Sequence, residues 1–195
     1  MVRNDDRRAR LADAGIRVLA ERGARGLTHR AVDELAGVPR GTASNYFRSR
    51  DELIAGLIER IETRITPDPV LHAELAGQPP TRDLFAAYLR DIVSRLTAHP
   101  EVTLAMFELR LEAARRPEVA ERMGVWLRGN FEGDVAFNAA AGLPGGRAEI
   151  ALFHYAIDGL LFDRLTLPID PATPSADVVS TLVAALLPAG DGPAA

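Results

Sequence analysis

Apolar residues recur every three or four positions along most of the chain, a spacing that places them on one face of an α-helix. Clear examples are Leu11, Ala14, Val18 and Leu19 in one segment, and Leu53, Ile54, Leu57, Ile58 and Ile61 in another. No stretch alternates apolar and polar residues with an enrichment in β-branched side chains, as a half-buried strand would. The pattern therefore predicts an all-α fold.

Capping residues and prolines indicate where these helices begin and end. Thr28 is expected to cap a short second helix that stops at Gly37. Pro39 fits the start of a third helix over 40–47, and Ser49 with Glu52 forms a capping box that opens a fourth. Thr66–Thr81 carries four prolines and is expected to break helices. Further helices are predicted over 83–99, 101–115, 118–141, 147–167 and 175–187.

The composition of the 195-residue chain excludes several kinds of chemistry. The chain contains neither lysine nor cysteine, so it has no Walker A lysine, no Schiff-base lysine, no disulfide and no thiolate zinc site. No apolar run approaches the ~18 residues of a membrane span, and residues 1–10 lack the apolar region of a signal peptide. We therefore expect a cytoplasmic protein that does not enter a membrane.

Charge is distributed unevenly along the chain. Residues 1–50 hold 11 arginines and six acidic residues, a net charge of +5, whereas residues 51–195 carry −9. A basic segment on an acidic body is typical of a local polyanion-binding face. A solvated arginine-rich helix would give the same charge balance, so charge alone leaves both interpretations open.

The segment from Leu27 to Phe47 predicts a helix-turn-helix, because two short helices flank a turn centred on Gly37. The residues that would point outward from the third helix are short or polar, which allows that helix to enter a major groove. They are Arg40, Gly41, Thr42, Ser44 and Asn45. Arg40 can pair with guanine and Asn45 with adenine. A helical hairpin that serves only packing remains the alternative on spacing alone.

Several donors flank this helix and are of the type that contacts phosphate. Thr28, His29 and Arg30 lie at the start of the second helix, where free backbone N–H groups also favour an anion. Tyr46, Arg48 and Arg50 lie on the other side. Such contacts position a protein on DNA without reading its sequence.

These motifs resemble the N-terminal domain of TetR-family (tetracycline-repressor-like) transcriptional regulators over residues 7–60. The resemblance rests on Ala36-Gly37-Val38, Gly41-Thr42, Phe47 and Ser49-Arg50-Asp51-Glu52-Leu53. It implies a DNA-binding domain over 1–50, a connecting helix over 51–66 and a ligand-binding and dimerisation domain over 67–188. Residues 189–195 are expected to form a disordered tail. Ser44 and Pro39 depart from the family, which usually has Tyr and Ser there.

The resemblance also implies a homodimer on a pseudo-palindromic operator, released by a small-molecule effector. The helices predicted at 147–167 and 175–187 are apolar on more than one face and could pair across a two-fold axis. Burial of both in a monomer core is the alternative. Candidate pocket-lining residues are Phe85, Tyr88, Met106, Phe107, Arg110, Trp126, Asn130, Phe131, His154 and Asp158. Ordinary core packing is the alternative interpretation of the Phe and Met residues.

Other functions fit the sequence less well. His154 and Asp158 are four residues apart and suit a pocket pair, an interface pair or half of a metal site, but no second histidine cluster accompanies them, so we expect no metal. No cofactor is expected. Neither His-Glu-x-x-His nor Gly-x-Ser-x-Gly occurs, which argues against an all-helical enzyme. A helical adaptor that binds only protein is a further alternative to DNA binding.

Overall fold

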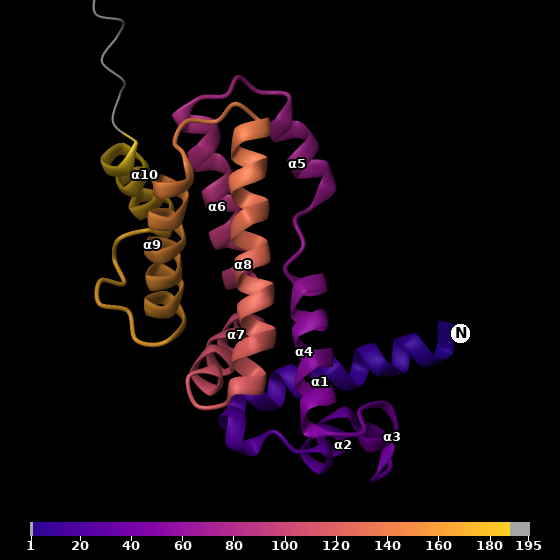
Figure 1. The fold of residues 1–195 in the computed structure, drawn as a ribbon. Coiled ribbons are helices and arrows are strands. Elements are labelled where there is room, and N and C mark those ends of the chain that lie inside the picture. The colour runs from indigo at the N-terminus through magenta and orange to yellow at the C-terminus, as the bar shows by residue number, and fades with distance from the viewer. Residues whose placement is uncertain (1, 188–195) are drawn as a thin grey trace, which may run out of the picture. The chain divides into compact units, whose positions relative to one another are not determined.

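The computed structural model describes residues 2–187, and every regular element in that range is a helix (Figure 1), which confirms the predicted all-α fold. The expected disorder of residues 189–195 concerns positions outside this range. Among the described helices, none has the length and apolar character needed to cross a bilayer. The helices are α1 (Val2–Gly26), α2 (His29–Ala36), α3 (Thr42–Tyr46), α4 (Arg50–Arg64), α5 (Pro69–Ala76), α6 (Arg82–Ala98), α7 (Pro100–Ala113), α8 (Pro117–Ala140), α9 (Arg147–Leu165) and α10 (Ser175–Leu186).

Helix α5 lies where the sequence indicated only helix-breaking prolines. Pro69 occupies the first turn of α5, where its missing N–H costs nothing, and the Asp68 carboxylate caps the helix by accepting from the N–H of Val70 at 2.8 Å. Pro69 therefore marks a helix start. The expectation that 66–81 only breaks helices thus missed α5.

The helices pack into two compact units, each with its own set of contacts. Within the described residues, the first contains 2–66 together with His99–Leu127, and the second contains Pro67–Ala98 and 128–187. Packing thus groups α7 with the N-terminal helices, whereas the sequence suggested a single C-terminal block over 67–188. The reason is a shared core, in which Val102, Ala105 and Leu109 of α7 belong to one buried cluster with α1 and α4.

Close helix contacts define the first unit. A Cβ atom on Gly15 of α1 would lie 2.6 Å from Leu57 of α4, and one on Gly56 would lie 2.3 Å from the Phe47 ring. The two glycines thus let α1 and the Phe47 ring approach α4 closely. Arg60 of α4 donates to the carboxylate of Asp13 in α1 through two nitrogens, at 2.9 and 2.8 Å. These contacts fix α4 against the helices that precede it.

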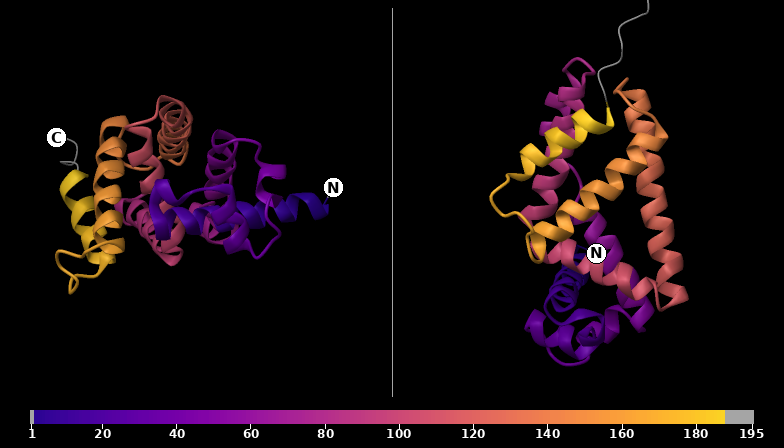
Figure 2. Two further views of the ribbon diagram at one scale, coloured as in Figure 1. Left: turned by 90° about the horizontal axis from the view of Figure 1, so that it is seen from below. Right: turned by 90° about the vertical axis from the view of Figure 1, so that its left-hand side faces the viewer.

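The second unit is built around α6, α9 and α10, each of which contacts the other two (Figure 2). Phe85 of α6 packs against Phe153 of α9, with ring centroids 4.8 Å apart. Arg82 donates to the carbonyl of Leu187 just beyond α10, at 2.9 Å. The amide of the buried Asn138 donates to the carbonyl of Gly145 at 2.9 Å, which holds the turn between α8 and α9.

Candidate nucleic-acid interface

Helix α2 begins and ends where the sequence predicts. The Thr28 hydroxyl accepts from the N–H of Ala31 at 3.1 Å and caps the helix. Gly37 follows the last turn with a φ of +65°, a left-handed conformation that glycine adopts without strain. Both boundaries are therefore set by local residue chemistry.

Helix α3 is shorter than predicted. It begins at Thr42, whereas the position of Pro39 indicated a helix from Arg40. Gly41 has a φ of +87°, which breaks helical geometry, so Arg40 and Gly41 belong to the turn. The Thr42 hydroxyl donates to the Pro39 carbonyl at 2.5 Å and closes this turn.

A buried carboxylate, which the residue pattern did not indicate, joins the two helices. Asp33 of α2 is only 1% exposed, and its two oxygens accept from the N–H groups of Gly41 and Ala43, each at 2.7 Å. A negative charge at this position also suits the positive end of α3. Asp33 therefore holds the start of α3 at a fixed position relative to α2.

The outer face of the turn and of α3 is open to solvent. Arg40, Gly41, Ser44 and Asn45 are exposed, whereas Ala43 and Phe47 are fully buried beneath them. The Ser44 hydroxyl donates to the Gly41 carbonyl at 2.9 Å, so its oxygen remains able to accept. Thr42 and Tyr46 are half-buried at the edges of this face. The predicted base-contacting residues thus lie together on one exposed surface, where Gly41, Thr42 and Ser44 are small.

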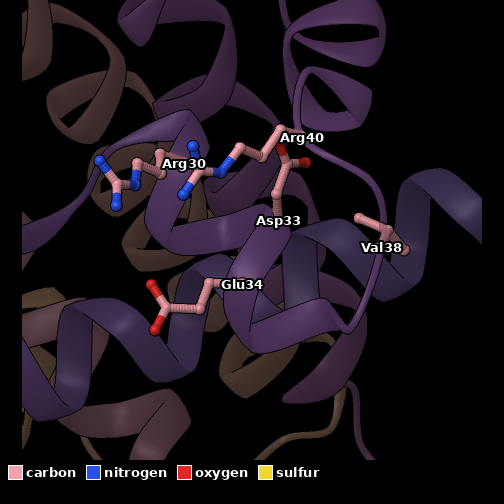
Figure 3. A pocket seen from close by; sticks show the side chains of 5 residues that line it. All are labelled: Arg30, Asp33, Glu34, Val38 and Arg40. Atoms are coloured by element: carbon pink, nitrogen blue, oxygen red, sulfur yellow. The ribbon is translucent and has the colours of Figure 1, made fainter.

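Two arginines border a shallow hollow beside this surface. The hollow has a volume of about 300 Å³ and is lined by Arg30, Asp33, Glu34, Val38 and Arg40. In Figure 3, Arg40 extends from the turn across the hollow toward Arg30 of α2. Neither guanidinium pairs with an acidic side chain among the residues that the structure describes. Both cations are therefore available to an anionic partner.

The remaining predicted phosphate contacts differ in their surroundings. Thr28, Arg30 and Arg48 are exposed, as such contacts require. The Nε2 atom of His29 lies 2.6 Å from the Phe47 carbonyl, which suits an N–H donor at that atom and ties the start of α2 to the end of α3. His29 therefore has a structural contact in addition to its predicted role.

Arg50 has surroundings that the sequence did not predict. Its guanidinium donates to the carbonyls of Leu27 and of Ala24, the latter at 2.6 Å, and lies 3.6 Å from the carboxylate of Glu112 in α7. These three acceptors belong to the protein itself. Arg50 thus joins α4 to the end of α1 and to α7, and its contact with phosphate stays a prediction.

The candidate pocket residues fall into both compact units. Met106, Phe107, Arg110 and Trp126 belong to the first unit, and the other six belong to the second. Met106 is buried, and the indole Nε1 of Trp126 is buried without a hydrogen-bond partner among residues 2–187. A buried donor that finds no acceptor calls for an explanation, such as a ligand or water.

In the second unit the candidate residues take part in aromatic and ionic contacts. The ring of Tyr88 packs edge-on against Phe137, at 5.1 Å, and Phe131 packs edge-on against His154, at 5.4 Å. The Nε2 atom of His154 lies 3.0 Å from the carboxylate of Asp134 in α8. Asn130 and Asp158 are half-buried. No group of three His, Asp or Glu side chains within the described range could hold a metal ion.

Comparison with known proteins assigns the chain to a family. The family model for the tetracyclin repressor-like C-terminal domain matches residues 80–189, and the model for bacterial regulatory proteins of the tetR family matches residues 11–57. The HTH-type transcriptional regulator BetI of Rhizobium meliloti (strain 1021) is 28% identical over 177 residues, which cover 90% of this chain and 85% of BetI.

Solved structures show the same relationship. The multidrug binding protein EbrR in complex with ethidium is 26% identical, with a TM-score of 0.67, covering 94% of this chain and 99% of EbrR. The regulator FadR from Bacillus subtilis, in complex with stearoyl-CoA, is 18% identical with a TM-score of 0.70, covering 92% of this chain and 97% of FadR, and shows the shared fold. The chain therefore belongs to the TetR family of bacterial transcriptional regulators, which is a family of DNA-binding regulators and not of enzymes.

Proposed function

We propose that two copies of this chain bind a pseudo-palindromic operator in the cytoplasm and repress transcription there. The observation that carries the proposal is the exposed face of Arg40, Gly41, Ser44 and Asn45 above the buried Ala43. A short helix with small outward side chains can lie deep in the major groove. Repeated by two-fold symmetry, it would meet half-sites ~34–36 Å apart.

The residues on this face divide into two roles. Arg40 and Asn45 contact base edges, assisted by Thr42 and Ser44 through their hydroxyl oxygens and by the bare backbone at Gly41. The phosphate contacts come from Thr28, His29, Arg30, Tyr46 and Arg48, which surround the helix. Arg50 supports this arrangement by joining α4 to the end of α1, because its guanidinium donates to the carbonyls of Leu27 and Ala24.

Replacing Arg40 by Ala should weaken operator binding by about 1–3 kcal/mol and relax sequence preference at one base position in each half-site. Selection of bound duplexes from a random pool, followed by titration of the selected sites, measures both effects. Arg48→Ala is the matched control, since a lost phosphate contact should weaken all sequences alike and reduce the salt slope by about 1. A protein-binding adaptor would instead show no selection and no steep salt dependence.

The homodimer forms through the helices predicted at 147–167 and 175–187, which correspond to α9 and α10. Helix α9 exposes several large apolar side chains, including Leu152, Tyr155 and Phe162. In α10 the best-buried residues, Val179 and Val183, already pack inside their own unit. We therefore assign the larger share of the interface to α9.

A small molecule regulates the repressor because it binds more tightly to a conformation of the dimer in which the distance between the two DNA-binding faces does not match the operator half-sites. Of the candidate residues, Met106, Phe107, Arg110 and Trp126 lie in the first unit, and the buried indole N–H of Trp126 supports a site there by offering a donor. EbrR is a multidrug binding protein with a described ethidium complex, so ethidium is a suitable first probe.

Ethidium should change the fluorescence of Trp126, the only tryptophan of the chain, and should weaken operator binding. Because linkage is reciprocal, the factor by which ethidium lowers operator affinity must equal the factor by which operator lowers the affinity of the protein for ethidium, once a titration of ethidium into operator alone has accounted for intercalation into the duplex. Calorimetric titrations in both orders measure the two factors. Ethidium binding at equal affinity with and without operator would contradict the proposed regulation.

A further inference from the structure

The first turns of α1 extend beyond the core of the first unit. Every side chain between residues 5 and 10 is exposed or half-buried, and the first buried residue after them is Leu11. In Figure 1 this end of α1 projects past α4, on the side of α4 on which α3 lies. These turns therefore present side chains near the proposed DNA-contacting face without contributing to the core.

Arg8 fixes the start of α1 against the end of α3. Its guanidinium lies over the ring of Phe47, 5.0 Å from the ring centroid, and donates to the carboxylate of Glu59 in α4 at 2.9 Å. Phe47 is fully buried and ends α3. Because Arg8 is held by these two contacts, the residue next to it in the helix also lies beside the end of α3.

That residue is Arg7, a cation without a partner. Its side chain is exposed, and no acidic side chain pairs with it in the part of the chain that the structure describes. Leu11 and Ala14 follow it by four and seven residues, so all three share one face of α1. Leu11 and Ala14 are buried in the core of the first unit. Arg7 thus extends the inward face of α1 past the point where the core ends.

The acidic residues near the start of α1 lie on other faces. Asp5 comes two positions before Arg7 and therefore lies on the opposite side of the helix. The outward face of α1 is charge-balanced, since its exposed residues at helical spacing are Asp6, Arg10, Arg17 and Glu21. Arg17 and Glu21 on this face lie 3.8 Å apart. The attraction of α1 for a polyanion is therefore concentrated at Arg7.

A second exposed cation lies on the same edge of the proposed interface. Arg48 directly follows Phe47, just as Arg7 directly precedes Arg8, so the two arginines lie on either side of the contact between Arg8 and Phe47. Glu59, the acidic residue at this contact, already pairs with Arg8. Two such cations suit neighbouring phosphates of one DNA strand, which follow each other every ~3.4 Å along the helix axis.

We propose that Arg7 contacts a backbone phosphate of the DNA that flanks each half-site, beyond the phosphate contacted by Arg48. The contact widens the stretch of DNA that each copy covers and reads no base. It comes from a helix outside the helix-turn-helix. This inference rests on the proposed operator binding and adds one residue to it.

Arg7→Ala should reduce the salt slope of operator binding by about 0.9 for each bound copy. When salt rises from 50 to 200 mM, the wild type should therefore lose about three times more affinity per copy than the variant. Arg7→Lys keeps the charge and should keep the slope. Arg17→Ala is the matched control, because it removes the same charge from the outward face of the same helix. An equal decrease of the slope in Arg7→Ala and Arg17→Ala would overturn the proposal, since net charge alone would then explain it.

The length of the duplex gives an independent test. Wild type and Arg17→Ala should bind the selected operator with flanking DNA more tightly than a duplex trimmed to its two half-sites, whereas Arg7→Ala should lose most of this preference. Helix content and thermal unfolding should stay unchanged in these variants, since both positions are exposed. If Arg40→Ala weakens binding while Arg7→Ala keeps the wild-type slope and length preference, the contact of Arg7 alone is refuted. A wild type that selects no duplex would refute the proposed operator binding as well.

Discussion

Asp33→Ala should lower the free energy of unfolding by about 3 kcal/mol, because two hydrogen bonds to a buried charge are lost together. The N–H groups of Gly41 and Ala43 would then lie in a site without an acceptor. The start of α3 would no longer be fixed relative to α2. Operator affinity should therefore fall by a larger factor than the smaller folded fraction of the variant accounts for. Chemical denaturation and operator titration measure the two quantities.

Two controls separate this effect from a general loss of charge on α2. Glu34→Ala removes the neighbouring acidic group, which is exposed, and should leave stability nearly unchanged. Asp33→Asn keeps the shape but offers only one acceptor oxygen for two donors, so its cost should lie between those of the wild type and Asp33→Ala. Asp33→Ala with wild-type operator affinity would contradict the positioning role.

Arg50→Met should lower the free energy of unfolding by about 2 kcal/mol while leaving the salt dependence of operator binding unchanged. The substitution keeps an unbranched side chain but removes the donors to the carbonyls of Ala24 and Leu27. It also leaves the half-buried Glu112 without this cationic neighbour. Stability is again measured by chemical denaturation, and the salt slope by operator titration between 50 and 200 mM salt, roughly the range over which phosphate contacts show their effect.

Arg48→Met provides the comparison for Arg50, since Arg48 is exposed two residues earlier. It should reduce the salt slope by about 1 with little change in stability. The opposite result, a reduced slope and unchanged stability for Arg50→Met, would show that Arg50 contacts phosphate, as its position in the sequence suggested.

The sequence predicted those features that depend on neighbouring residues. Thr28 caps α2, Gly37 ends it, and Ser49 accepts from the N–H of Glu52 at the start of α4. Each is a contact between residues at most four apart, and each has a distinctive residue type. Helices α9 and α10 also lie within two residues of their predicted bounds, because their apolar repeat is long and proline-free.

The features that escaped prediction depend on residues far apart in the chain. In the sequence, Asp33 resembles any solvent-facing acidic residue. Only the folded turn places the N–H of Gly41 against its carboxylate. The sequence suggests a phosphate contact for Arg50 but does not indicate its hydrogen bond to the carbonyl of Ala24, 26 residues earlier. A single sequence specifies such partners only through the fold, so residue spacing could not identify them.

The packing of α7 limits how this regulator can be divided. Glu108 accepts from the N–H of Ala24 at 3.2 Å, beside the kink at Gly23, and Glu112 lies against Arg50. A fragment that ends at Thr66 would expose the apolar surface that α1 buries against α7. Chimeras with related regulators should therefore transfer 99–127 together with the N-terminal helices, because a junction at 66/67 alone would separate halves of one core.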